Sequence, residues 1–445
     1  MKNPHSKMIL LINPKTSKSP EVQKLFFREP NLGILYLAAV LDHNDIPVDI
    51  LDLEQFIDLS EQEVKEVIRE KIKDYKIFGI TCLTNTFHLA LDIASTIKEH
   101  IKDGFTVLGG PHVSFMYKEI LEDENQDLID FICIGEAENS FLKLVKKLIQ
   151  QDDLDNMENE LLSIPGIAFQ NSIGNLIVTN PSYKTDLDLL PLPARYKLSH
   201  EYYYYTVANV IVNRGCPNQC SFCSRQKLFK KTKIRTINSI LDEIRDIISL
   251  RTYNYINFYD NINISREFFK EFCNMFIENN LEIPWGCEIR IDEISEEDAS
   301  LLKKAGCRLI ATGIESASLE VLHKNFKYQH PDKVKRGVIN LKKYNIPIQA
   351  YFVLGLPGET EGTFNETVEY INNLPLENDD KIEYFVATPY PGSQLWDRKE
   401  EFGIKIIEHD FSKYDCNHII FETPDLNLIK LEKLYSIAKE IENDF

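Results

Sequence analysis

Three cysteines stand close together near the middle of the chain. Cys216, Cys220 and Cys223 lie in the segment RGCPNQCSFC with the spacing C-x3-C-x2-C. Thiolates favour zinc or iron–sulfur clusters, and three of them on one short loop can surround a soft metal centre. Three ligands leave one iron of a [4Fe-4S] cluster open to a small molecule. A structural zinc site needs four ligands, so the alternative is a zinc loop completed by a distant His or Cys.

The elements around these cysteines predict a partial barrel. Apolar runs alternate with amphipathic stretches from residue 208 to residue 388. The predicted strands are 208–212, 255–258, 285–291, 309–314, 348–353 and 382–388, and the predicted helices are 239–249, 266–278, 296–305, 332–343 and 362–374. This order predicts a partial (β/α)6 TIM-like barrel, with active residues at the carboxyl ends of its strands. The cysteines directly follow the first strand.

The cysteine loop resembles the signature of the radical SAM superfamily, which also follows the first strand of a partial barrel. Phe222 matches the aromatic residue that precedes the third cysteine in that family and packs near the adenine of S-adenosylmethionine. Later segments resemble the family's S-adenosylmethionine-binding strand ends. They contain Glu288 and Arg290, then Gly313, Glu315 and Ser316, then Gly355 and Gly358, and finally residues 388–393.

The resemblance implies a [4Fe-4S] cluster on the three cysteines and S-adenosylmethionine as cofactor. Cleavage would give methionine and a 5′-deoxyadenosyl radical, which removes a hydrogen atom from an unactivated carbon. Arg290 can pair with the carboxylate of S-adenosylmethionine, while Glu288 or Glu315 can accept from its ribose or amino group. The alternatives are an exposed ion pair between Arg290 and Glu288 and a structural partner for Glu315. An external electron donor such as flavodoxin or ferredoxin is expected.

The first part of the chain predicts a doubly wound, Rossmann-like parallel sheet. Predicted strands 8–12, 48–51, 77–82, 105–108 and 131–134 alternate with helices 32–41, 61–73, 87–100 and 138–149. Ligands of such sheets bind outside the carboxyl ends of the strands. Those ends carry Thr84, Gly109, Gly110 and Gly135.

This part resembles the cobalamin-binding domain that precedes many radical SAM barrels, through the segments PNLGILYLAA, GGPH and IGEAE and the linker LPLP. Cobalamin is therefore an expected third cofactor. The D-x-H-x-x-G motif that supplies a cobalt ligand in many cobalamin proteins is absent. His112 is the one histidine at a suitable strand end, and we interpret it as a loop residue rather than a cobalt neighbour. A domain that keeps this fold without the cofactor remains an alternative.

These patterns predict four regions: a cobalamin-binding domain at 1–150, a hairpin and linker at 151–200, a radical SAM barrel at 201–395 and a C-terminal segment at 396–445 that caps the substrate. The expected reaction is methylation of an unactivated carbon in a small molecule or short peptide. Radical rearrangement, cyclisation or oxidation without methyl transfer is the alternative, and a cobalamin or iron–sulfur sensor is the alternative outside the enzymes. No individual catalytic residue is assigned.

Composition excludes other classes. The 445 residues carry 50 basic and 69 acidic side chains, a net charge of −19. Such a chain gains little from phosphate neutralisation, so neither a nucleic acid nor an anionic membrane is expected as a partner. No run of about 18 apolar residues predicts a membrane span. Nine cysteines are too few for a disulfide scaffold of this size, and a cytoplasmic location is expected.

Overall fold

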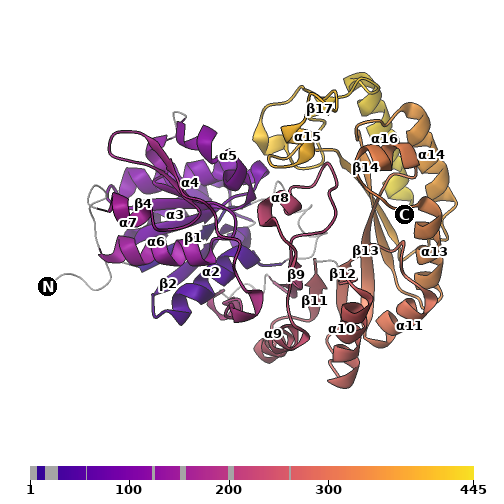
Figure 1. Cartoon of the computed structure of the whole chain (residues 1–445), viewed down its shortest axis with the longest axis horizontal. Coiled ribbons are helices and arrows are strands. Elements are labelled where there is room, and N and C mark those ends of the chain that lie inside the picture. The colour runs from indigo at the N-terminus through magenta and orange to yellow at the C-terminus, as the bar shows by residue number, and fades with distance from the viewer. Residues whose placement is uncertain are drawn as a thin grey trace. The chain divides into compact units, whose positions relative to one another are not determined.

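The computed structural model describes residues 8–15, 29–56, 58–122, 126–150, 157–198, 205–259 and 262–445. The chain forms two compact units (Figure 1). The first comprises Met1–Tyr205 and Leu228–Lys230, and the second comprises Thr206–Lys227 and Lys231–Phe445. Within the described residues, no helix is both long enough and apolar enough to cross a membrane.

The first unit is built on a mixed sheet of seven strands in the order β2-β1-β3-β4-β5-β6-β7. Strands β1 to β5 are parallel, and β6 and β7 add an antiparallel hairpin at the edge beside β5. The strands are β1 Met8–Asn13, β2 Val48–Asp52, β3 Tyr75–Thr81, β4 Phe105–Gly109, β5 Phe131–Cys133, β6 Ile167–Gln170 and β7 Leu176–Val178. The predicted parallel sheet is thus confirmed, and the predicted hairpin extends it.

Helices cover both faces of this sheet. They are α2 Leu32–His43, α3 Glu61–Lys71, α4 Phe87–His100, α5 Pro111–Glu122, α6 Glu138–Gln150 and α7 Glu158–Leu161. Successive residues of β1 point to opposite faces, because Ile9 belongs to the core beneath α2 and α6 whereas Leu10 belongs to the core beneath α3 and α4. Helix α5 was not predicted. It begins at Pro111, a residue suited to the first position of a helix.

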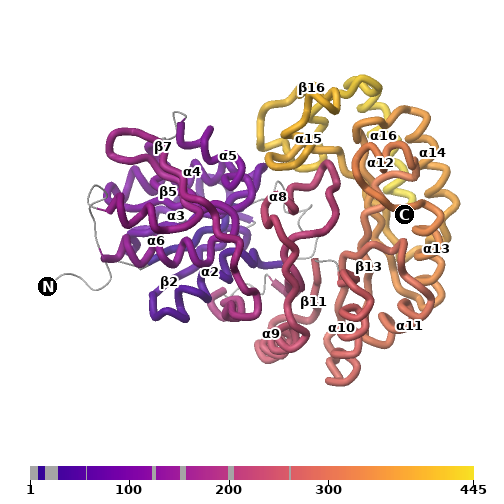
Figure 2. Tube along the Cα trace, in the orientation of Figure 1, coloured from indigo at the N-terminus to yellow at the C-terminus, as the bar shows by residue number. Residues whose placement is uncertain are grey.

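The second unit contains six parallel strands in the order β15-β14-β13-β12-β11-β8, which confirms the predicted partial barrel. The trace of this unit is coloured from rose to yellow in Figure 2. The strands are β8 Val207–Val210, β11 Tyr255–Phe258, β12 Trp285–Glu288, β13 Cys307–Glu315, β14 Ile348–Leu354 and β15 Lys381–Val386. The helices between them are α8 Arg225–Phe229, α9 Ile237–Leu250, α10 Arg266–Glu278, α11 Glu296–Lys304, α12 Leu319–Lys324, α13 Pro331–Lys342 and α14 Glu361–Asn372.

The C-terminal segment divides into two parts. Helix α16, Leu428–Asp444, lies beside α14 and β15, where Lys433 pairs with Glu361 at 3.0 Å and Glu442 accepts from the backbone N–H of Tyr384. It therefore covers the edge strand of the barrel. The preceding residues form α15 Gln394–Asp397, β16 Lys405–Ile406 and β17 Phe421–Glu422, and they share an apolar cluster with Phe222. Only this earlier part adjoins the cysteine loop.

Candidate cofactor sites

The cysteine loop is fixed at both of its ends. Strand β9, Asn213–Arg214, pairs in antiparallel fashion with β10, Lys233–Ile234, and the loop runs between them. Immediately after β10, the buried Arg235 forms an ion pair with Glu243 and donates to the carbonyl of Ile211 at 3.0 Å. A buried ion pair is costly to break. The ends of the loop are therefore firmly held at the carboxyl end of β8.

The three cysteines carry free thiols. Cys216 and Cys220 are half-buried and Cys223 is exposed. In the described parts of the chain, no group of three His, Cys, Asp or Glu side chains is arranged to hold a single metal ion. In a [4Fe-4S] cluster each thiolate binds a different iron, and the ligands need not converge on one point. The donor set therefore fits the cluster.

Glu315 at the end of β13 is paired. Its carboxylate lies 2.9 Å from Nζ of Lys327; Glu315 is buried and Lys327 is half-buried. Burial lowers the pKa of Lys327, but Glu315 and Cys220 together outweigh this effect and hold the pKa above its ordinary value. A Cβ at Gly313 would stand 2.3 Å from the Glu315 carboxylate, so this glycine makes room for the pair. The structural partner considered for Glu315 is thus present, and it is Lys327.

Glu288 is the last residue of β12 and is partly buried. The pKa of Glu288 is raised to about 7, and burial is the largest cause. The positive charges of Arg225 and Lys327 lower the pKa, whereas the negative charge of Glu315 raises it. These named groups are therefore electrostatic neighbours that come from the cysteine loop, β13 and the segment after α12. The structure brings them together at the carboxyl ends of the strands.

Arg290 lies two residues beyond β12, not within the strand as predicted. It pairs with Asp292 at 2.8 Å rather than with Glu288. The alternative interpretation, an exposed ion pair between Arg290 and Glu288, was therefore wrong. Its guanidinium also donates to the carbonyl of Tyr328 at 2.6 Å and to Asn218 of the cysteine loop at 3.4 Å. The amide of Asn263 holds the Arg290 carbonyl at 2.9 Å. Asp260 and Asn261, which shortly precede Asn263 in the chain, lie outside the described residues.

The remaining predicted residues of this unit differ in their surroundings. The hydroxyl of Ser316 lies 3.2 Å from that of Thr367 on α14, so it serves packing between elements. Gly355 and Gly358 have φ angles of 85° and 90°, which favour glycine, and the side chain of Lys324 passes close to Gly358. Phe222 is partly buried in the apolar cluster of the C-terminal segment.

In the first unit, the predicted strand ends form two glycine turns. Gly110 has a φ of 112°, and a Cβ there would stand 2.4 Å from the carbonyl oxygen of Cys82. The hydroxyl of Ser114 donates to the Gly110 carbonyl at 2.8 Å and accepts from the Gly135 N–H at 2.9 Å. A Cβ at Gly109 would meet no atom within 4 Å. The turns are thus held together beside open space at the end of β4.

His112 is a buried residue of α5 rather than the loop residue we expected. Its Nδ1 lies 3.2 Å from the hydroxyl of Thr84, its ring packs on Phe87, and burial lowers its pKa to about 4. The ring therefore belongs to the packing between α5 and the segment 84–87 that follows β3. The hydroxyl of Thr84 is buried with it.

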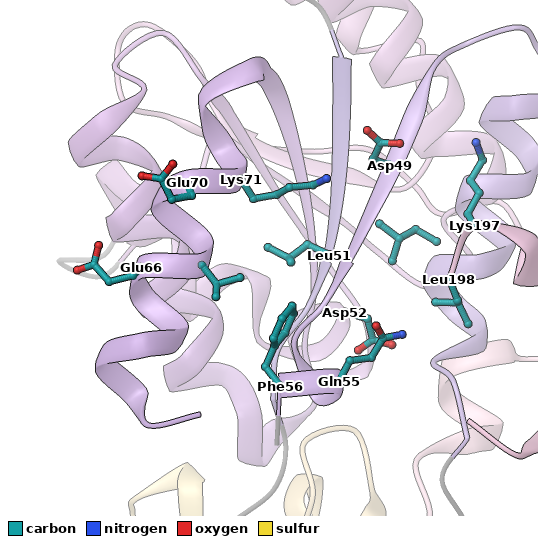
Figure 3. Close-up of a pocket in the computed structure, with 12 residues that line it drawn as sticks. Asp49, Leu51, Asp52, Gln55, Phe56, Glu66, Glu70, Lys71, Lys197 and Leu198 are labelled. Carbon is teal, nitrogen blue, oxygen red and sulfur yellow. The ribbon is translucent and has the colours of Figure 1, made fainter. Parts of the chain in front are cut away.

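A pocket of about 710 Å3 lies elsewhere in the first unit, between α3, the edge strand β2 and Lys197–Leu198 (Figure 3). Its apolar floor includes Leu51 and Phe56, and its rim carries Asp49, Glu66 and Glu70. None of the residues predicted to bind a cofactor lines it. It is therefore separate from the glycine turns.

Comparisons with known proteins match both units. A model of the radical SAM superfamily matches residues 210–371, and a B12 binding domain model matches residues 22–145. The chain is 31% identical over 397 residues to the anaerobic magnesium-protoporphyrin IX monomethyl ester cyclase of Rubrivivax gelatinosus, covering 87% of this chain and 68% of the relative. This chain belongs to the radical SAM superfamily. It falls in the group with an N-terminal B12-binding domain.

Two further comparisons cover most of this radical SAM protein, including both of its units. It is 28% identical over 408 residues to an uncharacterized methyltransferase of Pyrococcus horikoshii, covering 87% of this chain and 82% of the relative. The solved structure of TsrM from Kitasatospora setae, a radical S-adenosylmethionine methyltransferase with cobalamin and a [4Fe-4S] cluster bound, aligns with a TM-score of 0.73. That alignment has 16% identity and covers 97% of this chain and 88% of TsrM, and it shows a shared fold.

The radical SAM enzyme therefore uses a [4Fe-4S] cluster, S-adenosylmethionine and cobalamin. The free thiols on one anchored loop suit the cluster, and the open space beside Gly109 suits a ligand at the strand ends of the B12-binding domain. Sequence reasoning missed three residues: Lys327, which pairs with Glu315; Ser114, which bonds Gly135; and Asn325, which accepts from the hydroxyl of Ser221 at 2.6 Å. Their bonds join residues far apart in the chain, and no local spacing signals such bonds.

Proposed function

We propose that this enzyme methylates an unactivated carbon of a small molecule or short peptide, with the cluster held by Cys216, Cys220 and Cys223. The observation that carries the proposal is the anchored loop of three free thiols at the carboxyl end of β8 in a radical SAM barrel. The B12-binding domain and the relative named as a methyltransferase support methyl transfer. When bound, the cofactors supply a carbon-centred radical and a methyl donor.

The charged groups at the barrel rim suit S-adenosylmethionine. Arg290, oriented by Asp292, presents a guanidinium beside the cysteine loop that can pair with the cofactor carboxylate. Glu288 can accept hydrogen bonds from the amino group or ribose hydroxyls when it is ionised. Glu315 is already paired, and we assign it the orientation of Lys327. Gly355 and Gly358 shape the adenine side, with Phe222 packing nearby, whereas Ser316 is not assigned to the cofactor.

We place cobalamin in the first unit along the ends of β3, β4 and β5. Gly109 leaves open space there, and Ser114 holds the turns at Gly110 and Gly135 in a fixed relation. Thr84 contributes to this edge through its contact with His112 rather than through a free hydroxyl. Because His112 is packed inside the domain, this region offers no histidine ligand of the kind that the missing motif would supply.

Two partners complete the proposal. The substrate-capping role is confined to residues 394–423, because these residues pack with Phe222 beside the cysteine loop while α16 covers an edge strand. A small-molecule substrate is favoured by analogy with TsrM, one structure of which contains a tryptophan substrate. An external flavodoxin- or ferredoxin-like protein would supply the electrons that the cluster needs.

A second candidate reaction is cyclisation or oxidation without methyl transfer. The relative from Rubrivivax gelatinosus is named as a cyclase, and it is at least as similar to this chain as the named methyltransferase. Both reactions begin with the same radical, so the rim residues do not separate them. The fate of the methyl group of S-adenosylmethionine does.

A product assay distinguishes the two reactions. Radical methylation consumes one S-adenosylmethionine as methyl donor and a second as radical source, so S-adenosylhomocysteine and 5′-deoxyadenosine should form in roughly equal amounts during turnover. With methyl-deuterated S-adenosylmethionine, mass spectrometry should find the label in the product. Turnover that gives 5′-deoxyadenosine without S-adenosylhomocysteine would favour cyclisation or oxidation.

Glu288→Gln should make the cofactor-free protein more stable and at the same time weaken its binding of S-adenosylmethionine. The folded carboxyl group has a pKa of about 7 against 4.5 for its ordinary value, so folding retains a proton across this interval and the free energy of unfolding falls as the pH rises. At pH 8 the cofactor-free variant should be more stable by about 1–3 kcal/mol. Its affinity for S-adenosylmethionine should fall by about tenfold.

Denaturant unfolding and S-adenosylmethionine titration at pH 6 and pH 8 test this expectation. The parent should bind S-adenosylmethionine better at pH 8, where Glu288 is ionised, and the variant should lose that dependence. Glu366→Gln, at an exposed position on α14, serves as the control. Unchanged binding in Glu288→Gln at both pH values would remove Glu288 from the site.

A further inference from the structure

Ser221 is a fully buried residue inside the cysteine loop, between Cys220 and Phe222. Its backbone N–H donates to the carbonyl of Asn325 at 3.0 Å, and its hydroxyl donates to Oδ1 of Asn325 at 2.6 Å. Its own carbonyl accepts from the N–H of Leu395 at 2.9 Å. Cys220, the neighbouring residue, is half-buried, whereas Ser221 is fully buried. The bonds of Ser221 therefore fix the position of the cysteine loop against the barrel.

Asn325 is equally buried and uses every polar atom of its side chain. It follows the last residue of α12, and its Nδ2 donates to the carbonyls of Val321 at 2.8 Å and Pro357 at 2.9 Å. Pro357 lies in the loop between Gly355 and Gly358. One amide therefore links the cysteine loop, the end of α12 and the glycine loop after β14.

We propose that Ser221 and Asn325 form a clamp that positions the cluster relative to bound S-adenosylmethionine. The inference rests on the proposed function, because it assumes that the three cysteines hold the cluster and that the glycine loop binds the cofactor. The cysteines would hold the cluster and the Gly355–Gly358 turn would hold the adenine end of the cofactor, so the separation of these two segments would decide how the cluster and the cofactor meet. Small errors in such geometry cost large factors in activity.

The network has the properties that such a clamp needs. Its bonds are buried, and buried hydrogen-bond networks are rigid when every member is satisfied. It joins elements that are far apart in the chain, since 104 residues separate Ser221 from Asn325. Neither residue offers a polar atom to a ligand. Both are therefore positioning residues, which act through the cysteines and through the Gly355–Gly358 turn.

Two substitutions open the clamp on different sides. Ser221→Ala removes the bond from the hydroxyl to Oδ1 and leaves the bonds from Nδ2 intact. Asn325→Asp keeps an oxygen for Ser221 but replaces the donor that faces the Pro357 carbonyl. Neither removes a cysteine, and the backbone bond between the two residues survives in both. The control is Asn279→Ala, whose amide bonds the Met275 carbonyl at the C-terminus of α10, the end of the barrel away from the cysteines.

The test uses the full chain with reconstituted cluster and added cobalamin. Iron and sulfide analysis measures cluster content, and electron paramagnetic resonance of the reduced cluster follows its titration with S-adenosylmethionine. Each clamp variant should keep the parent's cluster content and bind S-adenosylmethionine about tenfold more weakly, with an altered spectrum at saturation. The double variant should lose less than the product of the two single effects, because both open the same clamp.

The outcomes separate this inference from the proposed function. Parent-like titrations and spectra in both clamp variants would overturn the clamp, while the assignment of the cysteines would stand. Loss of iron in Ser221→Ala would also overturn it, since the serine would then retain the cluster rather than position it. An equal loss of affinity for S-adenosylmethionine in Asn279→Ala would also overturn the clamp, because the loss would then reflect a general decrease in stability. If the parent spectrum does not respond to S-adenosylmethionine, the proposed function itself fails.

Discussion

Replacing Cys216, Cys220 and Cys223 by Ala should abolish the visible absorption of the reconstituted cluster. The production of 5′-deoxyadenosine should fall by at least about a thousandfold, because no other side chain supplies this chemistry. The ends of the loop are held by the β9–β10 pair, so the chain should remain folded. Absorption spectroscopy, iron analysis and chromatography of the nucleoside products measure these effects.

Cys416→Ser is the matched control for the cysteine variants. Cys416 is half-buried in the same unit, but it lies outside the loop and bonds with the hydroxyl of Tyr390. The control should retain the iron content and the visible absorption of the parent. A triple variant that still assembled a cluster or still cleaved S-adenosylmethionine would disprove the assignment of these three ligands.

Gly109→Leu should weaken cobalamin binding without unfolding the first unit. A side chain at this position enters open space at the end of β4, so the free energy of unfolding should change by no more than about 0.5 kcal/mol. If cobalamin occupies that space, its affinity should fall by roughly ten- to hundredfold. Titration with hydroxocobalamin, followed by absorbance, measures the affinity.

Two other glycines give the contrast for this experiment. Gly362→Leu, at an exposed position on α14, should leave cobalamin binding unchanged. Gly110→Ala should destabilise the domain, because its Cβ would collide with the backbone of Cys82. Full cobalamin affinity in Gly109→Leu would show that the cofactor does not lie over the end of β4.

Local patterns were sufficient to predict the architecture. Alternating apolar and amphipathic runs predicted the core strands and most long helices, because burial on a sheet or beneath a helix imposes a period on neighbouring residues. Helix α5 was missed because the two glycines before it and Pro111 at its first position resemble a loop. The edge position of β6 and β7 was also not predicted, since short strands carry no signal for their partner.

The same limit applies to the candidate sites. The spacing of Cys216, Cys220 and Cys223 within eight residues is readable because one loop carries all three ligands. The sequence did not predict which carboxylate would form an ion pair with which basic side chain. Glu315 meets Lys327 and Arg290 meets Asp292 because of the bulge and turns at the ends of β13 and β12.

The sequence by itself determined the family, the cluster with S-adenosylmethionine and the order of the two units, because each depends on residues close together in the chain. It predicted cobalamin as the third cofactor but left open a domain without it. Only the tertiary structure decided how the rim is held together. It buried His112, paired Glu315, directed Ser316 toward α14 and joined Ser221 to Asn325. These outcomes depend on burial and on hydrogen bonds between distant segments, and their partners become neighbours only when the strands assemble.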